Sequence, residues 1–185
     1  MKKILTIFSL LFFSNAANAA EITAWKIIPA QSNISFKVTQ DATPILGSFK
    51  KFNGQINFDK AQLAKSNITI EVETASVTSS LVEASGTLQS PEWMSSKAFP
   101  KAVFTANKFT QNGKGYKAEG KLTIKGKSVP TTLDFTLEEY SATKARAVGT
   151  TTIKRTAFAV GDADVKKANG VKDDVEITFT INAEK

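Results

Sequence analysis

The 185-residue chain contains no cysteine and no histidine. A Ser-His-Asp or Cys-His nucleophile therefore cannot be assembled, and thiol redox chemistry is excluded. Structural zinc sites are built mainly from these two residue types, so a zinc site here would consist of carboxylates alone. No disulfide is available, and the fold must be stabilised by packing. We predict no catalytic residue, no metal site and no cofactor.

Long hydrophobic runs are also lacking. The longest, residues 4–13, has ten residues, whereas a helix that crosses a bilayer needs about 20. It follows two lysines and precedes an A-x-A pattern at residues 17–19, which is typical of a secretory signal peptide. We predict that residues 1–19 are cleaved and that residues 20–185 form a single soluble domain, periplasmic or secreted.

Charge of one sign is not concentrated anywhere. The formal net charge of +7 falls to +5 when Lys2 and Lys3 leave with the signal peptide. The remaining lysines are scattered, and the only adjacent pairs are Lys50-Lys51 and Lys166-Lys167. A nucleic-acid interface has a denser basic stripe with aromatic residues between its cations. We therefore predict no nucleic-acid partner.

What the sequence does contain is alternation of apolar and polar residues. Residues 33–38, 116–125 and 175–182 alternate with a period of two, which is typical of half-buried antiparallel strands. Turn residues at 112–115 and 125–127 favour hairpins. About eight such strands predict an all-β fold, either a barrel or a sandwich.

The alternation slips once, within residues 46–59. Phe52 and Phe58 share one face of this strand, while Phe49 falls on the opposite face. Either both faces are covered, or a bulge near Lys50-Lys51 resets the register.

Helical signals are confined to residues 79–97. Ser80 and Glu83 fit a capping box, which marks the start of a first short helix. Ser90 followed by Pro91 favours a second short helix over residues 91–97.

Phenylalanine is abundant, with 13 residues, and many of them lie on the apolar face of a predicted strand. In a sandwich they would fill the core. In a small barrel the interior can be filled by side chains or can hold one small ligand. Periodicity alone leaves both alternatives open.

Five segments occur in a recognisable order. They are WKIIPAQSNISFKV at 25–38, GSFKKFNGQINFD at 47–59, LQSPEWM…FP…F at 88–104, GKLTIKG at 120–126 and RTAFAVG at 155–161. Together they resemble the YceI-like family, the lipocalin-like, polyisoprenoid-binding proteins of the bacterial periplasm.

The resemblance implies an eight-stranded antiparallel, lipocalin-like barrel with one short helical segment around residues 79–97. It also implies an apolar interior that holds a polyprenyl lipid, an isoprenoid quinone or a similar long-chain amphiphile, for carriage or storage. The residues predicted to line this pocket are Phe36, Val38, Phe49, Phe58, Ile70, Leu81, Trp93, Met94, Phe99, Phe135, Phe158 and Phe179.

The chain departs from the family pattern at polar positions. Gln31 and Thr87 stand where the family often has histidine, and Glu92 begins the residues that replace its D-F-F-D motif. These three residues are the candidates for contact with a polar head group. Their side chains can form hydrogen bonds but do not titrate near neutral pH.

Two other functions remain as alternatives. A filled barrel would act through its surface, as a stress or interaction protein without a lipid ligand. An enzyme acting on a bound lipid would need the carboxylates of Glu92 or Asp59 or a lysine, and no paired-carboxylate motif supports it. We favour a hydrophobic small-molecule ligand, no enzymatic activity, transient contact with inner-membrane proteins, and a monomer or homodimer.

Overall fold

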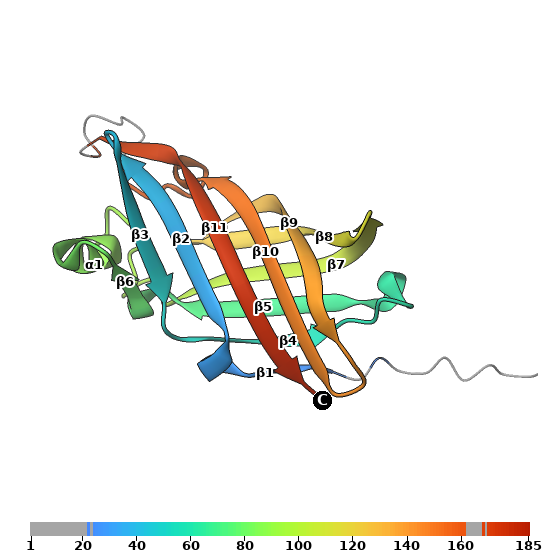
Figure 1. The fold of residues 1–185 in the computed structure, drawn as a ribbon. Helices are drawn as coiled ribbons and strands as arrows, with labels where there is room; N and C mark the ends of the chain where they lie inside the picture. Colours follow the sequence, from blue (N-terminus) through green and yellow to red (C-terminus); the bar gives the residue numbers. More distant parts are fainter. Residues whose placement is uncertain (1–21, 23, 162–167, 169) are drawn as a thin grey trace, which may run out of the picture.

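The computed structural model describes residue 22 and residues 24–161, 168 and 170–185. The predicted signal peptide, residues 1–19, lies outside the described residues. Eleven described strands form one antiparallel sheet in the order β4-β5-β7-β8-β9-β10-β11-β2-β3-β6, with β1 paired to β11 (Figure 1). The strands are β1 (Lys26–Ile27), β2 (Asn33–Gln40), β3 (Thr43–Phe49), β4 (Phe52–Asn57), β5 (Asn67–Glu73), β6 (Val77–Ser79), β7 (Lys101–Asn112), β8 (Gly115–Ile124), β9 (Lys127–Tyr140), β10 (Lys144–Lys154) and β11 (Val171–Glu184).

The all-β prediction is confirmed, although the described strands number eleven and not eight. β1 and β6 have only two and three residues, too few for an alternation to be recognised in the sequence. A bend at Lys50 and Lys51 divides the predicted strand 46–59 into β3 and β4. The long strands β7 to β11 are joined by antiparallel pairing throughout, as the alternation predicts.

The sheet curls into an open, barrel-like shell. In Figure 1, β2, β3, β10 and β11 cross in front of β4, β5, β7 and β8, so the sheet folds back over itself. The N-terminal segment connects the two sides: Trp25 forms a bridge with Ile56 of β4, while Lys26 and Ile27 pair with β11. The apolar strand faces point into the space that the curled sheet encloses.

The bend at Lys50 and Lys51 is held by the short 3₁₀ helix η3 (Thr74–Ser76). The Lys50 N–H donates to the Ser76 carbonyl at 3.1 Å, and the Lys51 N–H donates to the Ser76 hydroxyl at 3.0 Å. The fold therefore adopts neither a continuous strand nor a bulge: β3 ends at Phe49, and β4 begins at Phe52 with a different partner strand. Phe49 and Phe58, which have opposite parity, both reach the interior.

One α-helix, α1 (Val82–Gln89), is described at one end of the shell. Its N-cap residue is Leu81 and makes no side-chain capping bond, so the predicted capping box is wrong. The Ser80 hydroxyl instead accepts the Leu46 N–H at 3.2 Å. The other helical segments are short 3₁₀ turns, namely η1 (Pro29–Gln31), η2 (Leu63–Lys65), η3 and η4 (Arg155–Phe158).

Residues 91–97 form successive turns and not the predicted second helix. The chain doubles back onto α1, because the Met94 N–H donates to the Leu88 carbonyl at 3.0 Å and the Ser96 N–H donates to the Gln89 carbonyl at 3.1 Å. Ser95 takes a positive φ of 50°, which a continuing helix does not allow. Within the described residues, no helix combines the length and apolar character needed to cross a membrane.

Candidate functional site: an apolar cavity inside the sheet

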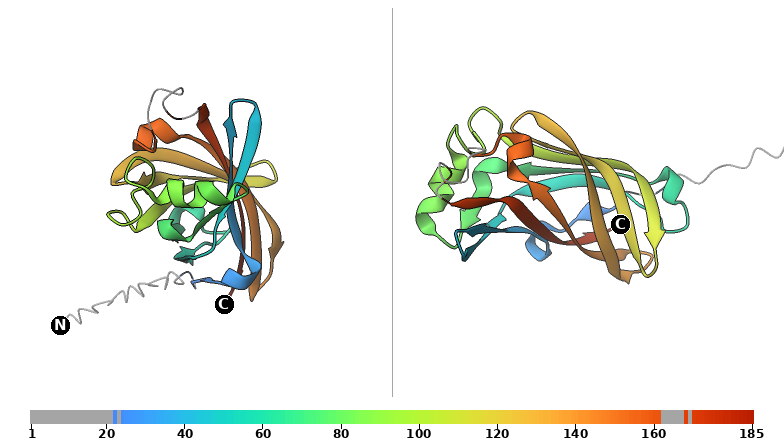
Figure 2. Two further views of the ribbon diagram at one scale, coloured as in Figure 1. Left: turned by 90° about the vertical axis from the view of Figure 1, so that its left-hand side faces the viewer. Right: turned by 90° about the horizontal axis from the view of Figure 1, so that it is seen from above.

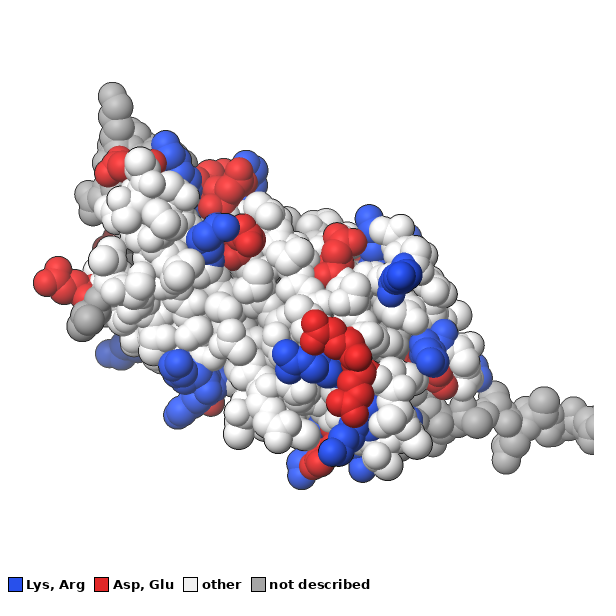
Figure 3. Space-filling model, in the orientation of Figure 1, with Lys and Arg blue, Asp and Glu red and all other residues white. Residues whose placement is uncertain are grey.

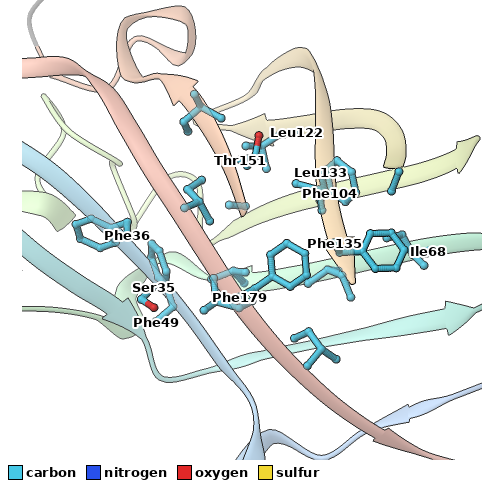
Figure 4. Close-up of a pocket in the computed structure, with 18 of the residues that line it drawn as sticks. Ser35, Phe36, Phe49, Ile68, Phe104, Leu122, Leu133, Phe135, Thr151 and Phe179 are labelled. Atoms are coloured by element: carbon cyan, nitrogen blue, oxygen red, sulfur yellow. The ribbon is translucent and has the colours of Figure 1, made fainter. Parts of the chain in front are cut away.

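A cavity of about 280 Å³ lies inside the curled sheet. Its lining comes from both sides of the shell, from α1 and the turns after it, and from η4. Figure 4 shows Phe36 and Phe49 at one end of this space, Phe179 near the middle, and Phe135 and Ile68 toward the other end. The alternation of the strands therefore produces an apolar interior that retains free volume.

Few polar side chains line the cavity, and the hydroxyls of two of them form hydrogen bonds to residues outside the lining. The Thr151 hydroxyl donates to the Thr132 carbonyl at 2.9 Å, and the Ser35 hydroxyl lies 3.2 Å from the hydroxyl of Thr178. Aromatic and aliphatic side chains make up nearly all of the remaining wall. Such a surface suits an apolar ligand, which gains mainly by leaving water.

The structure brings together ten of the twelve residues predicted for an apolar pocket. These ten line the cavity: Phe36, Val38, Phe49, Phe58, Ile70, Trp93, Met94, Phe135, Phe158 and Phe179.

Two predicted pocket residues are placed elsewhere. Leu81 precedes α1 and is 47% exposed, and it is not part of the lining. Phe99 is 37% exposed and lies outside, where its ring packs so closely on Gly126 that an added Cβ there would be 2.9 Å from it. An apolar residue type near the helix does not by itself show whether the side chain turns inward.

None of the three predicted head-group residues lines the cavity. Gln31 is exposed in η1, and its carbonyl accepts a hydrogen bond from Asn182. Thr87 is exposed on α1, and its hydroxyl donates to the Glu83 carbonyl at 3.4 Å. Glu92 is exposed as well; a backbone hydrogen bond and the Ser90 hydroxyl, 2.9 Å away, lower the pKa of its carboxyl. None of the three therefore belongs to the cavity wall, and their contact with a head group stays a prediction.

Arg155 also lines the cavity and is not among the residues predicted from the sequence. It is only 3% exposed, and it is the one charged side chain among the described residues that line the cavity. Its Nε, Nη1 and Nη2 atoms donate to the carbonyls of Lys172, Val160 and Val171 at 2.9 to 3.1 Å. A signal existed in the sequence, since the chain has only two arginines and arginine is the cation best suited to burial.

Asp173 supports the same corner of the site. Its carboxylate accepts hydrogen bonds from the Thr156 N–H at 3.0 Å and the Thr156 hydroxyl at 2.8 Å. Burial alone would raise the pKa of Asp173, but the Thr156 bonds and the charges of Lys154 and Arg155 together lower it below the usual value. The carboxylate is therefore ionised at neutral pH and fixes η4, which carries Arg155.

One end of the cavity is closed by residues 82–99, which we call the cover segment. Leu88, Trp93 and Met94 of this segment line the cavity, and the left panel of Figure 2 shows α1 lying across that end of the shell. The Trp93 ring stacks near Arg155, whose guanidinium carbon is 5.7 Å from the ring centre. The Glu92 carbonyl accepts from the Gly161 N–H at 2.9 Å and from Lys125 Nζ at 3.1 Å. The cover segment is thus held by a few specific contacts.

The opposite end is filled by a cluster of rings that we call the aromatic floor. Ring centres of neighbouring members lie 5.4 to 6.3 Å apart, mostly in edge-to-face or tilted contact, which is the favoured arrangement of aromatic pairs. The members are Trp25, Phe58, Phe109, Tyr116, Phe135 and Tyr140.

Beyond the floor lies solvent. Lys60 Nζ sits 5.0 Å from the centre of the Tyr140 ring and Lys185 Nζ sits 4.4 Å from the centre of the Trp25 ring, and both lysines are exposed. Burial, with a contribution from the Asp59 charge, raises the pKa of the Tyr140 phenol, so the hydroxyl is neutral at physiological pH. The cavity therefore has a rigid aromatic end and an end covered by a separate segment.

The family model of the YceI-like domain matches residues 25–183. The chain belongs to the YceI-like family. A UPF0312 protein of Yersinia enterocolitica is 32% identical over 136 residues, which cover 72% of this chain and 69% of the relative. A protein named YceI from Salmonella newport is 31% identical over 135 residues and covers 71% of this chain and 69% of its own length.

Solved structures agree with this YceI-like fold. BcnA of Burkholderia cenocepacia superposes with a TM-score of 0.78 at 32% identity, over 85% of this chain and 99% of BcnA. A polyisoprenoid binding domain from Saccharophagus degradans gives a TM-score of 0.66 at 14% identity, over 86% of this chain and 97% of that domain. At that identity the second likeness concerns the fold alone.

The outer surface of this YceI-like domain contrasts with its interior. Lysines and acidic residues are mixed over the face shown in Figure 3. Several form cross-strand pairs, such as Lys37 with Glu176 at 2.7 Å and Lys154 with Asp174 at 2.6 Å. Exposed pairs of this kind add little stability, about 0–1 kcal/mol each.

Proposed function

We propose that this protein binds the apolar tail of an isoprenoid lipid, an isoprenoid quinone or a similar long-chain amphiphile in its cavity, for carriage or storage in the periplasm. The observation that carries the proposal is the almost wholly apolar cavity inside the sheet. Membership of the YceI-like family, and the fold shared with a polyisoprenoid binding domain, support the ligand class. The signal-like N-terminal sequence supports the compartment.

The affinity of such a site comes from removing the tail from water. Each buried CH₂ group contributes about 0.8 kcal/mol before the entropic cost of association is subtracted. The wall supplies apolar contacts of varied shape, including Met94, whose thioether side chain adapts to irregular ligands. We propose binding without catalysis, because the lining offers packing surface and one arginine already bonded to backbone carbonyls.

The orientation of the ligand follows from the two different ends of the cavity. Arg155 and Trp93 lie at the covered end, whereas the opposite end consists of aromatic rings. A polar head group is compatible with the Arg155 end, where a positive charge and an indole are present. The tail would then extend toward Phe135 and the aromatic floor.

Native mass spectrometry of the protein purified from its own host tests this function. The expected result is a bound species whose mass, after extraction, matches an isoprenoid lipid or quinone. Protein stripped of lipid should take up an added isoprenoid quinone in the same measurement. Recovery of ligand-free protein alone, together with no uptake of the added quinone, would contradict the proposal.

A further inference from the structure

The two ends of the cavity differ in a way that bears on which ligands fit. Resting on the function proposed above, we infer that the aromatic floor sets the longest tail that the cavity accepts. Phe58 is the stop at the centre of this floor. The protein would therefore select its ligand by chain length as well as by hydrophobicity.

Phe58 has the most ring contacts of the floor. Its ring centre lies 5.5 Å from those of Phe109 and Tyr116, 5.8 Å from that of Phe135 and 6.3 Å from that of Tyr140. Its side chain lines the cavity and the residue is only 5% exposed. A ligand that advances along the cavity therefore meets a ring that is surrounded by other rings.

The backbone of Phe58 is fixed as well. Its carbonyl accepts the Trp25 indole N–H at 2.9 Å, and the Tyr140 hydroxyl lies 3.5 Å from the same oxygen. Trp25 in turn bridges to Ile56, so the floor is tied to the β4 edge of the sheet. Because packed aromatic side chains move only with the loss of many contacts, the floor resists displacement.

The available volume also limits the tail. Ligand pockets in proteins measure about 300–1,000 Å³, and this cavity of about 280 Å³ lies just below that range. On the far side of the floor, the exposed Lys60 and Lys185 lie against the rings of Tyr140 and Trp25, so these two rings face charged side chains there. A tail that enters from the covered end is stopped at Phe58.

The consequence for affinity is a plateau. Each CH₂ that reaches the cavity should tighten binding about fourfold. Once the tail touches the floor, additional isoprene units remain outside and add nothing. Affinity should then stop increasing with chain length, although longer tails are more hydrophobic.

Titration of lipid-stripped protein with farnesol, geranylgeraniol and solanesol, three isoprenoid alcohols of increasing length, tests the inference. For the natural sequence, the dissociation constant should fall from farnesol to geranylgeraniol and then stay level for solanesol. Phe58→Ala opens space beneath the stop, so solanesol should bind this variant at least tenfold more tightly than geranylgeraniol. Phe58→Leu keeps an apolar side chain and the fold. Solanesol should bind this variant about threefold more tightly than geranylgeraniol.

Phe52→Ala is the matched control. Phe52 is 8% exposed and packs with Ile27 and Ile181 in a cluster behind the cavity wall and outside the aromatic floor; it is not itself part of the cavity lining. This variant also loses a phenyl ring from the interior. Its affinity should nevertheless stop increasing at the same chain length as in the natural sequence. If Phe58→Ala does not fold, the comparison of Phe58→Leu with Phe52→Ala shows whether the affinity plateau depends on Phe58.

The outcomes separate the two proposals. An affinity of the natural sequence that continues to rise to solanesol, or a plateau that does not move in either Phe58 variant, overturns the chain-length inference and leaves lipid binding intact. Failure of all three alcohols to bind the natural sequence contradicts the proposed function itself.

Discussion

At the scale of single residues, the contrast between the two arginines explains where a charge can be tolerated. Arg155 is buried beside an apolar cavity, and its planar guanidinium reaches three backbone carbonyls at once. Arg146 lies closer to solvent and pairs with Glu138 at 2.7 Å. Burying a charge is unfavourable unless its hydrogen bonds are satisfied, so the carbonyl geometry around Arg155 is what makes its position possible.

Replacement of Arg155 by lysine should therefore destabilise the protein. A single ammonium retains the charge but cannot reach three carbonyls in different directions, and bonds to charged groups contribute about 1.5–3 kcal/mol each. We expect Arg155→Lys to lower the free energy of unfolding, measured in urea, by about 2–3 kcal/mol. Arg146→Lys is the control and should change it by about 0.5 kcal/mol or less. Equal losses in the two variants would show that the carbonyl contacts are not the cause.

The ionisation of Asp173, near Arg155, should make the free energy of unfolding depend on pH. Its folded-state pKa is lowered, so its stabilising effect is present above the unfolded pKa and is lost as pH falls through the folded value. Asp173→Asn should lower the free energy of unfolding by about 1–2 kcal/mol at neutral pH, and the difference from the natural sequence should disappear as the pH falls through the lowered pKa of Asp173.

The measurement is urea unfolding of both proteins at neutral and acidic pH. Asp174→Asn serves as the control, since that side chain is 60% exposed in its pair with Lys154. Its substitution should change stability by less than about 0.5 kcal/mol at either pH. A loss in Asp173→Asn that is the same at both pH values would rule out the carboxylate as its source.

At the scale of elements, sequence patterns determine which side of a strand is apolar but not how the ends of the shell are closed. The alternation predicts β2, β8 and β11 well, because half-buried antiparallel strands require it. It does not show that residues 91–97 turn back onto α1, since that depends on the hydrogen bond from Met94 to Leu88.

The candidate site was predictable to a similar degree. Inward-facing strand residues such as Phe36 and Phe179 follow from parity alone. Whether the enclosed space is filled depends on the curvature of the sheet, which no local pattern encodes, and the resemblance to a family decided that question. On α1, Thr87 is exposed while its neighbour Leu88 lines the cavity, so the rotation of one short helix, which the sequence does not show, decides which of the two side chains faces inward.

The cover segment leads to a prediction about Gly161. This residue has a φ of +68°, and an added Cβ would lie 2.9 Å from Arg155 Nη1 and 3.1 Å from Trp93 Cζ3. Gly113 has a similar φ of +60°, but nothing lies within 4 Å of its added Cβ. Gly113→Ala therefore measures the backbone penalty alone, about 1–2 kcal/mol, while Gly161→Ala adds the clash.

We expect Gly161→Ala to lose about 1 kcal/mol more than Gly113→Ala in urea unfolding. Because the clash pushes on Trp93, a bound isoprenoid should also dissociate several-fold faster from Gly161→Ala, whereas Gly113→Ala should release it at the natural rate. Identical release rates in the two variants would show that the Gly161 contact does not hold the cover segment closed.

At the scale of the whole molecule, the cavity wall and the hydrophobic core share many side chains. Phe58, Phe104 and Ala118 belong to the main core cluster and also line the cavity. The protein has no disulfide to compensate for the missing packing at its centre. Since an unfilled space forgoes contacts that a filled core would have, a ligand of the right size supplies part of the packing of the fold.

Ligand binding should consequently raise thermal stability, and the effect should depend on the cavity being empty. A ligand at one hundred times its dissociation constant stabilises the folded state by about 2.7 kcal/mol, which corresponds to a rise in Tm of about 5–10 °C for a domain of this size. Ala147→Phe places a ring into the cavity from β10. In this variant the rise on adding geranylgeraniol should fall below about 2 °C, because the ring occupies the space that the tail needs.

The neighbouring substitution Val148→Phe distinguishes this effect from a general disturbance of β10. Val148 follows Ala147 on the strand and is not part of the cavity lining, so its side chain points to the other face of the sheet. The added ring is the same, but the cavity is unchanged, and the full rise in Tm should persist. A rise that is lost in both variants would mean that the lipid stabilises the protein from outside the shell; a rise that is lost only in Ala147→Phe would place the lipid among the side chains that also form the core.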